Sequence, residues 1–276
     1  MTIDFDNQRG LKPGLKPGLV IYLTVGDPDL ATTRQIALAA IDAGADVLEL
    51  GVPFSDPVAD GPVIQRASER ALAQGIRLTD VLCLAAELRR LRPAAGLVIF
   101  SYFNPILRLG LERFFEQAAQ AGVDGVLITD LTVEESGEYV SWARRTGLKP
   151  IFLAAPTSTD ARLQSIAQVS EGFVYAISRT GITGKRENLA SDALELVARL
   201  RRYTRLPIAV GFGISRAEHV AAVGEFADAA VIGSAIVSLI EEAAPGTAAA
   251  AVADFIQGLR PAMALPEPSI QGLGEG

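Results

Sequence analysis

The sequence has one cysteine and one histidine among its 276 residues. Cys83 has no second cysteine to pair with inside the chain, and such scarcity favours a reducing compartment. One histidine and one cysteine are too few for a zinc or other soft-metal cluster, which takes three or four such ligands. The sequence therefore predicts no metal site, and His219 is not expected to bind a metal ion.

Long apolar segments are also missing, although 49% of the residues are hydrophobic. No run approaches the roughly 20 apolar residues that cross a membrane, and the opening Met-Thr-Ile-Asp-Phe-Asp does not resemble a signal peptide. Positive charge is in deficit, with a net charge of −7 and an isoelectric point near 4.9. This balance argues against binding to nucleic acid or an anionic membrane. We expect a soluble protein of the cytoplasm.

Short apolar runs, in contrast, are frequent, and eight of them have the length of a β-strand. Most are continuously apolar rather than alternating, which is typical of parallel strands that are covered on both faces. The expected strands are Leu19–Thr24, Val47–Val52, Leu97–Tyr102, Gly125–Thr129, Pro150–Ala154, Phe173–Ile177, Ile208–Gly211 and Ala229–Ile232.

Helical patterns separate these runs. The expected helices are Leu30–Ala43, one beginning at Pro62, Leu78–Leu91, Leu111–Ala121, Glu134–Thr146, Ala161–Ser170, Ser191–Tyr203, Ser215–Val223, Ala235–Ala244 and Thr247–Leu259. Eight βα units within about 250 residues predict a single (β/α)8 TIM barrel with extra short helices. The alternative, an open doubly wound sheet, usually carries Gly-x-Gly-x-x-Gly after its first strand, and this chain has no such loop there.

The two ends of the chain differ in composition from the barrel. Residues 1–18 contain Gly-Leu-Lys-Pro twice and are expected to form an irregular lead-in. The barrel, which would be the catalytic domain, is expected over residues 19–260. Residues 261–276 are rich in proline and glycine, and we expect a flexible tail there.

Two carboxylates flank the end of the second expected strand. Glu49 lies within an apolar run, and Asp60 lies eleven residues later in a loop interrupted by Pro53 and Pro57. Two acids in different environments suit proton transfer, because the environment separates their pKa values. The alternatives are a buried structural ion pair for Glu49 and ordinary turn chemistry for Asp60.

Glycines cluster after the last two expected strands. Gly211-Phe212-Gly213 follows the seventh strand, and Gly233-Ser234 follows the eighth and opens a helix. Backbone N–H groups at a helix N-terminus bind anions, and barrels commonly hold phosphate at this place. Tight packing is the alternative explanation, but we expect a phosphate site. The loop Ser178–Leu189, with two glycines, is interpreted as a lid.

Lysine is scarce as well. The four lysines are Lys12, Lys16, Lys149 and Lys185. None is expected at the carboxyl end of a barrel strand, where a lysine could form a Schiff base with a substrate carbonyl. Cleavage of a phosphorylated substrate would therefore depend on carboxylates alone.

Several segments together resemble the tryptophan synthase α-subunit family. The longest is Leu-Glu-Leu-Gly-Val-Pro-Phe-Ser-Asp-Pro-Val-Ala-Asp-Gly-Pro-Val-Ile-Gln at positions 48–65. It is supported by Tyr-Leu-Thr-Val-Gly-Asp-Pro at 22–28, Asp130 with Glu134 and Glu135, Thr-Gly-Ile-Thr-Gly at 180–184, Gly-Phe-Gly at 211–213 and Gly-Ser-Ala-Ile-Val at 233–237. The resemblance extends from about Leu19 to about Gly258.

The resemblance implies a retro-aldol cleavage of indole-3-glycerol phosphate to indole and glyceraldehyde 3-phosphate, in the last stage of L-tryptophan biosynthesis. By the family pattern, Glu49 is the general acid/base that protonates ring carbon C3 and takes the hydroxyl proton of the substrate. Asp60 accepts a hydrogen bond from the indole N–H. The pattern places Tyr22, Phe100, Leu127, Leu153 and Phe212 in the indole pocket, Tyr175 and Thr183 near the reacting carbons and Asp60, and Gly184, Gly213, Gly233 and Ser234 around the phosphate.

The resemblance also implies a partner. The family's α subunit binds a pyridoxal-phosphate-dependent β subunit in an α2β2 heterotetramer, so no cofactor is expected in this chain. The expected contact surface is the loop Pro53–Asp60, the segment Asn104–Leu109 and the lid.

Two departures from the family pattern are visible. Thr132 stands where the family usually has proline, and the Gly-Leu-Lys-Pro repeat replaces the short helix that normally covers the barrel floor. Three other functions are considered: a stand-alone lyase that releases free indole, a non-catalytic module that activates a partner, and another phosphate-binding barrel such as a sugar-phosphate isomerase. The presence of Glu49, Asp60 and the phosphate glycines disfavours the non-catalytic module, and the 48–65 signature disfavours the isomerase.

Overall fold

The computed structural model describes residues 17–177, 186–211 and 213–259, with the backbone alone for 186–190. Eight parallel strands form a closed barrel in the order β1 to β8, with each strand hydrogen-bonded to its neighbours in sequence and β8 returning to β1. The strands are β1 Gly18–Thr24, β2 Val47–Gly51, β3 Gly96–Ser101, β4 Gly125–Ile128, β5 Lys149–Ala154, β6 Val174–Ile177, β7 Ile208–Gly211 and β8 Ala229–Ile232. The expected (β/α)8 barrel is confirmed.

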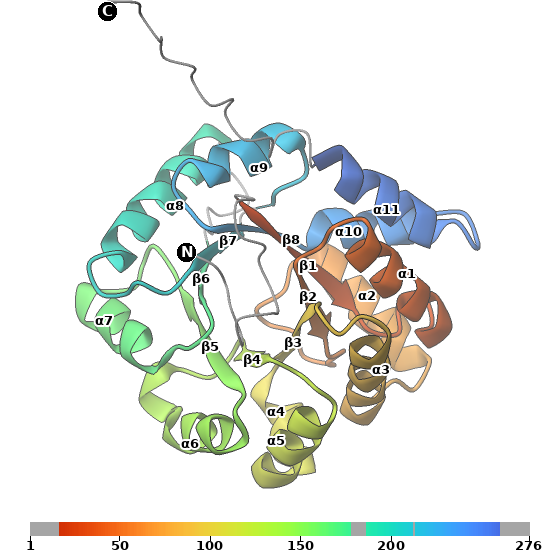
Figure 1. The fold of residues 1–276 in the computed structure, drawn as a ribbon, viewed down its shortest axis with the longest axis horizontal. Helices are drawn as coiled ribbons and strands as arrows, with labels where there is room; N and C mark the ends of the chain where they lie inside the picture. Colours follow the sequence, from red (N-terminus) through yellow and green to blue (C-terminus); the bar gives the residue numbers. More distant parts are fainter. Residues whose placement is uncertain (1–16, 178–185, 212, 260–276) are drawn as a thin grey trace, which may run out of the picture.

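Helices surround the barrel as an outer ring (Figure 1). They are α1 Leu30–Asp42, α2 Pro62–Ala73, α3 Leu78–Leu91, α4 Phe103–Leu109, α5 Leu111–Gln120, α6 Gly137–Thr146, α7 Asp160–Val169, α8 Arg186–Leu200, α9 Ala217–Gly224, α10 Ser234–Glu242 and α11 Ala248–Leu259. No helix in the described ranges combines the length and apolar character needed to cross a membrane.

Three helical segments differ from expectation. The helix expected over Glu134–Thr146 is divided into a 3-10 turn, Val133–Glu135, and α6. Thr132, which occupies the usual proline position, precedes this turn, and its hydroxyl donates to the Glu135 carboxylate at 3.1 Å. α4 was not expected, because Asn104-Pro105 is typical of a turn. Proline is tolerated there because the N–H groups of a helix's first turn have no intrahelical partner.

The expectations for the termini and the lid are largely untested. Residues 1–16 of the lead-in and the whole tail (261–276) lie outside the described residues, whereas Pro17 is described and Gly18 already belongs to β1. Most of the expected lid also lies outside them, while its last residues, from Arg186 onward, belong to α8 rather than to a loop.

Apolar side chains fill the barrel and separate it from the helices. The interior cluster consists of Val20, Val47, Val98, Leu127, Ile151, Phe173, Ala209, Ala229 and Val231. A larger cluster occupies the space between strands and helices. Both faces of each strand are therefore covered, which explains the continuously apolar runs in the sequence.

Three aspartates connect neighbouring strands at the amino-terminal end of the barrel. Asp46, Asp124 and Asp228 directly precede β2, β4 and β8. Each accepts a hydrogen bond of 2.8–2.9 Å from a backbone N–H near the beginning of the preceding strand. Arg89 of α3 also binds Asp124, and Arg201 binds Asp228. These carboxylates therefore tie neighbouring strands together at the end remote from the expected site.

Replacement of Asp124 by alanine is expected to lower the free energy of unfolding by about 3 kcal/mol. The change removes the acceptor of a strand N–H and separates Arg89 from a buried carboxylate. Asp42→Ala is the control, because Asp42 binds Arg92 on the exposed surface and should lose less than about 1 kcal/mol. Urea unfolding followed by circular dichroism measures both, and similar losses in the two variants would contradict the special role of Asp124.

Candidate active site

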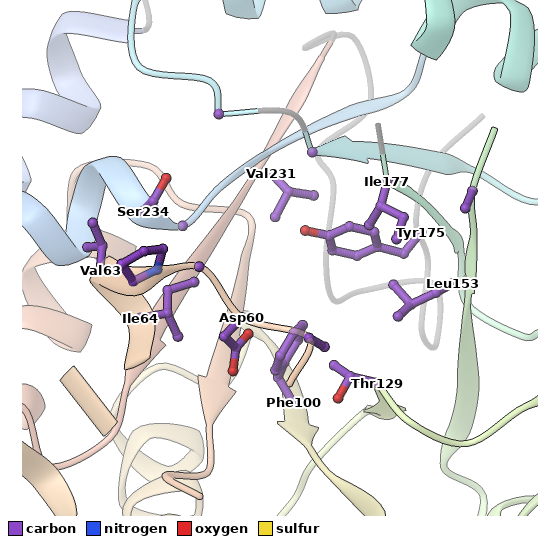
Figure 2. A pocket seen from close by; sticks show the side chains of 17 residues that line it. Asp60, Val63, Ile64, Phe100, Thr129, Leu153, Tyr175, Ile177, Val231 and Ser234 are labelled. Atoms are coloured by element: carbon purple, nitrogen blue, oxygen red, sulfur yellow. The ribbon is translucent and has the colours of Figure 1, made fainter. Parts of the chain in front are cut away.

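A pocket of about 800 Å³ opens at the carboxyl ends of the strands (Figure 2). The β2–α2 loop and the beginning of α2 form one wall, and the carboxyl ends of strands β3 to β8 with the beginning of α10 form the others. The residues named from the sequence that line it are Asp60, Phe100, Leu153, Tyr175, Gly213, Gly233 and Ser234. Residues from distant parts of the chain thus meet in one cavity.

The remaining sequence-predicted residues have different positions. Tyr22, Glu49 and Leu127 are buried on β1, β2 and β4 and are not among the lining residues. Leu127 belongs to the interior cluster, against which Phe100, Leu153 and Tyr175 pack. Leu127 therefore supports the pocket wall rather than forming it. Thr183, Gly184 and Phe212 lie outside the described residues.

Glu49 is fully buried inside the barrel. Within the described part of the chain, neither of its carboxyl oxygens has a hydrogen-bond partner. Burial raises the pKa of Glu49 to about 8, because the charged form cannot be solvated there. No ion pair to Glu49 is found among the described residues, so the structure gives no support there to the structural alternative. A carboxyl in this state carries its proton at neutral pH and can donate it.

Two tyrosines lie close to this carboxyl. Tyr22 is the register partner of Glu49 across the β1–β2 ladder, and its ring packs edge-on against Phe100 at 5.1 Å. Tyr175 comes from β6, which lies across the barrel from β2 (Figure 1). Burial raises the pKa of both phenols, and the charge of Asp60, together with that of Glu49 once it is ionised, raises both further. Both phenols therefore stay protonated at neutral pH.

Two glycines make room for the tyrosine hydroxyls. A Cβ atom at Gly51 would lie 2.4 Å from the Tyr22 hydroxyl oxygen, and one at Gly211 would lie 2.7 Å from that of Tyr175. Real Cβ atoms do not approach other heavy atoms so closely. The sequence gives no signal that these two glycines contact tyrosines on neighbouring strands.

Asp60 lies in the β2–α2 loop, half-buried at the pocket wall. The Gln65 side-chain amide donates to the Asp60 backbone carbonyl at 2.9 Å and holds the loop against α2. The hydroxyl of Tyr102 donates to Asp60 Oδ2 at 3.0 Å. Sequence reasoning missed Tyr102; the available signal was a tyrosine directly after the end of a barrel strand, where functional residues collect.

The opposite wall of the pocket is the N-terminus of α10. Ser234 is its first residue and is exposed toward the pocket, and Gly233 is the residue before it. Gly213 has a φ of 76°, a conformation that favours glycine. The first backbone N–H groups of a helix have no partner within the helix and attract anions. This wall therefore has the chemistry of an anion site.

A cluster of ion pairs joins α2 and α10, the helices that begin at the two pocket walls. Arg70 of α2 binds Asp27 after β1 through two hydrogen bonds of 2.7 and 2.9 Å, and it also binds Glu241 of α10 at 2.7 Å. Arg66 of α2 binds the same glutamate. The helices that begin at the two walls are thereby connected by charge as well as by packing.

Within the described residues, no group of three or more His, Cys, Asp or Glu side chains is arranged to hold a metal ion.

The fold and the pocket together define a class: a (β/α)8-barrel enzyme whose site lies at the carboxyl ends of the strands, with a protonated buried glutamate beneath it. The family model for the tryptophan synthase alpha chain matches residues 10–262. The chain belongs to the tryptophan synthase alpha chain family.

Individual relatives agree with this assignment. The alpha chain of Solibacter usitatus is 50% identical over 238 residues, which span 86% of this chain and 89% of that one. The crystal structure of the Legionella pneumophila alpha subunit is 37% identical, with a TM-score of 0.82 over 90% of this chain and 93% of that chain. A Mycobacterium tuberculosis tryptophan synthase structure is 33% identical, with a TM-score of 0.85 over 95% and 97% of the two chains.

The raised pKa of Glu49 predicts a pH-dependent cost in stability. Between its ordinary value of 4.5 and about 8, the folded chain keeps a proton that the unfolded chain has lost, so stability falls as the pH rises through this window. Relative to Glu49→Gln, the wild type should lose roughly 4 kcal/mol of unfolding free energy between pH 4.5 and 8.5, since one pKa unit corresponds to about 1.4 kcal/mol.

Urea unfolding across this pH range measures the difference between the two proteins. Glu87→Gln serves as the control, because Glu87 is a surface residue paired with Arg34. The difference between Glu87→Gln and the wild type, measured across the same pH range, is the baseline. A Glu49→Gln difference that changes with pH no more than this baseline would show that the folded chain does not hold a proton on Glu49.

Proposed function

We propose that this chain cleaves indole-3-glycerol phosphate by a retro-aldol reaction, giving indole and glyceraldehyde 3-phosphate in the last stage of L-tryptophan biosynthesis. The observation that supports it most directly is the buried, protonated Glu49 beneath a pocket that carries a second carboxylate, Asp60, on its wall. Family membership supports the same reaction.

In this proposal one carboxyl group performs both proton transfers. Glu49 in its acid form donates its proton to ring carbon C3, and the ring becomes a cation whose charge lies on the indole nitrogen. The Glu49 carboxylate then takes the proton of the side-chain hydroxyl next to the ring. The bond between C3 and the side chain breaks, its electrons return to the ring, and the aldehyde forms. Glu49 ends with the proton that it had at the start.

Asp60 has the complementary role. As an anion at the pocket wall it accepts a hydrogen bond from the indole N–H and stabilises the positive charge that develops on the ring. Asp60 is only half-buried and accepts a hydrogen bond from Tyr102, while Glu49 is fully buried and has no hydrogen-bond partner among the described residues. The two acids are thus suited to different tasks by their surroundings.

The rest of the substrate fits the remaining walls. Phe100, Leu153 and Tyr175 offer apolar surface to the indole ring (Figure 2). The phosphate is assigned to the α10 N-terminus with Gly213, Gly233 and Ser234. Tyr22 and Leu127 act from behind the wall, and Thr183, Gly184 and Phe212 keep their assigned roles as predictions from family resemblance.

A β subunit is the proposed partner, in an α2β2 heterotetramer, with pyridoxal phosphate on the β subunit and none on this chain. A similar structure, 40% identical in sequence, is that of the tryptophan synthase complex from Pyrococcus furiosus. In this chain Val58 of the β2–α2 loop is 81% exposed and Leu107 of α4 is 49% exposed. Both residues lie in segments that the family resemblance assigns to the contact surface, and docking is proposed there. A cytoplasmic location belongs to the same proposal.

The cleavage itself is the first test. Purified chain is incubated with indole-3-glycerol phosphate, with and without a β subunit, and indole is followed. Glu49→Gln should lower the rate by at least about 10²-fold, because general acid–base catalysis contributes about 10²–10⁴, while binding of glycerol 3-phosphate should change less than a few-fold. Residual cleavage above about a hundredth of the wild-type rate would contradict the role of Glu49.

The same assay separates the other functions. A wild-type chain that is as fast alone as with the β subunit would be a stand-alone lyase. A chain that cleaves nothing in either mixture, yet speeds the β subunit's own reaction, would be a non-catalytic module. Glu49 and Asp60 are both present, and we favour the lyase that acts with a β partner.

A negative charge introduced at the N-terminus of α10 tests whether the substrate phosphate binds there. Ser234→Asp should weaken binding of glycerol 3-phosphate at least tenfold, because the carboxylate repels the phosphate and occupies the helix N-terminal N–H groups. Asp at a helix N-terminus stabilises the helix, so loss of folding would not explain the result. Ser238→Asp, one turn further along α10, is the matched control, and equal weakening by both variants would place the phosphate elsewhere.

A further inference from the structure

Tyr102 lies directly behind the wall that carries Asp60. It is the residue between the end of β3 and the beginning of α4, and only 2% of its surface is exposed. It is not among the described residues that line the pocket, so within the described structure it acts on the pocket through the residues that it contacts.

The hydroxyl of Tyr102 has two partners in the β2–α2 loop. It accepts a hydrogen bond from the backbone N–H of Ala59 at 2.9 Å and donates its proton to Asp60 Oδ2 at 3.0 Å. A phenol has a single proton, and the Ala59 N–H can only donate. The Thr129 side chain also hydrogen-bonds the Tyr102 hydroxyl and by itself lowers the pKa of Tyr102, as a donor does. The proton of Tyr102 is therefore assigned to the Asp60 carboxylate, which can only accept.

The position of Tyr102 itself is firmly set. The next residue, Phe103, donates its backbone N–H to Asp130 Oδ1 at 2.7 Å, which ties the beginning of α4 to the loop after β4. The ring of Tyr102 packs against Phe54 with the centroids 5.0 Å apart. Burial, and then the negative charge of Asp60, raise the pKa of Tyr102, so it remains a donor throughout the neutral range.

We propose that Tyr102 is a positioning residue for Asp60: its hydroxyl fixes the orientation of the carboxylate toward the indole N–H and stabilises the ionised form. An aspartate side chain has two rotatable bonds. A hydrogen bond to one carboxylate oxygen restricts their rotation and thereby fixes the direction in which the other oxygen points. Donation to the charged form also favours ionisation. The proposal rests on the proposed function, because it assumes that Asp60 meets the substrate ring.

The test uses indolepropanol phosphate as the probe. This compound keeps the ring N–H and the phosphate but lacks the hydroxyl whose deprotonation starts bond cleavage, so it binds without reacting. Dissociation constants are measured by calorimetry on the full chain for wild type, Tyr102→Phe, Asp60→Ala and the double variant. Tyr102→Phe should weaken binding about 10- to 150-fold, the range for losing a hydrogen bond to a charged group.

The effect of Tyr102→Phe in the Asp60→Ala variant distinguishes a positioning role from a general disturbance of the pocket. If Tyr102 acts through Asp60, then Tyr102→Phe should change binding less than twofold in Asp60→Ala. Glycerol 3-phosphate, which has no ring, should bind Tyr102→Phe as it binds the wild type. Tyr139→Phe is the matched control: its hydroxyl is also buried and donates to the Val126 carbonyl at 2.6 Å, away from the pocket, so it should leave probe binding unchanged.

Three results would overturn the positioning role. The first is that Tyr102→Phe lowers the affinity for indolepropanol phosphate equally with and without Asp60, and the second is that it does not lower the affinity at all. The third is tighter binding, which would mean that Tyr102 holds Asp60 away from the ring. A wild-type chain that binds neither indolepropanol phosphate nor glycerol 3-phosphate would instead refute the proposed function, and this proposal with it. If the wild-type chain binds both compounds, and Tyr102→Phe weakens binding equally with and without Asp60, only the positioning role is refuted and the proposed function stands.

Discussion

The parallel β1–β8 ladder, which closes the barrel, is the constraint on which the pocket depends. Residues from Gly18 to Ile21 pair with residues from Ala229 to Ile232, so the last βα unit lies beside the first. The wall with Asp60 and the wall with Ser234 thereby face each other, although 174 positions separate the two residues in the sequence. The Arg70–Glu241 contact connects the helices that begin at these walls.

Closure also creates the interior in which Glu49 is kept neutral. A carboxyl group surrounded by apolar side chains and without a hydrogen-bond partner among the described residues is costly to ionise. At the other end of the barrel the aspartates before β2, β4 and β8 are anchored by backbone N–H groups. Stability and chemistry are thus placed at opposite ends, which is the usual division in this fold.

Prediction of the strands from the sequence succeeded because each strand is an uninterrupted apolar run. Glu49 and Asp60 could be named together because one segment carries both, and their roles remain predictions. α4 was missed, because Asn104-Pro105 indicates a turn unless the helix position of the proline is known. Tyr102 was missed for a different reason: its importance comes from a contact with a residue 42 positions away.

By itself, the sequence determined the barrel, the family resemblance and the two carboxylates, because local apolar patterns and a long contiguous motif are readable without contacts. Only the tertiary structure decided which carboxyl stays protonated, since the pKa of Glu49 depends on burial among strands β1, β3 and their neighbours. It also decided that Gly51 accommodates Tyr22 and that Tyr102 donates to Asp60. Close approach and hydrogen bonding depend on distances in space, and the order of residues along a chain does not specify them.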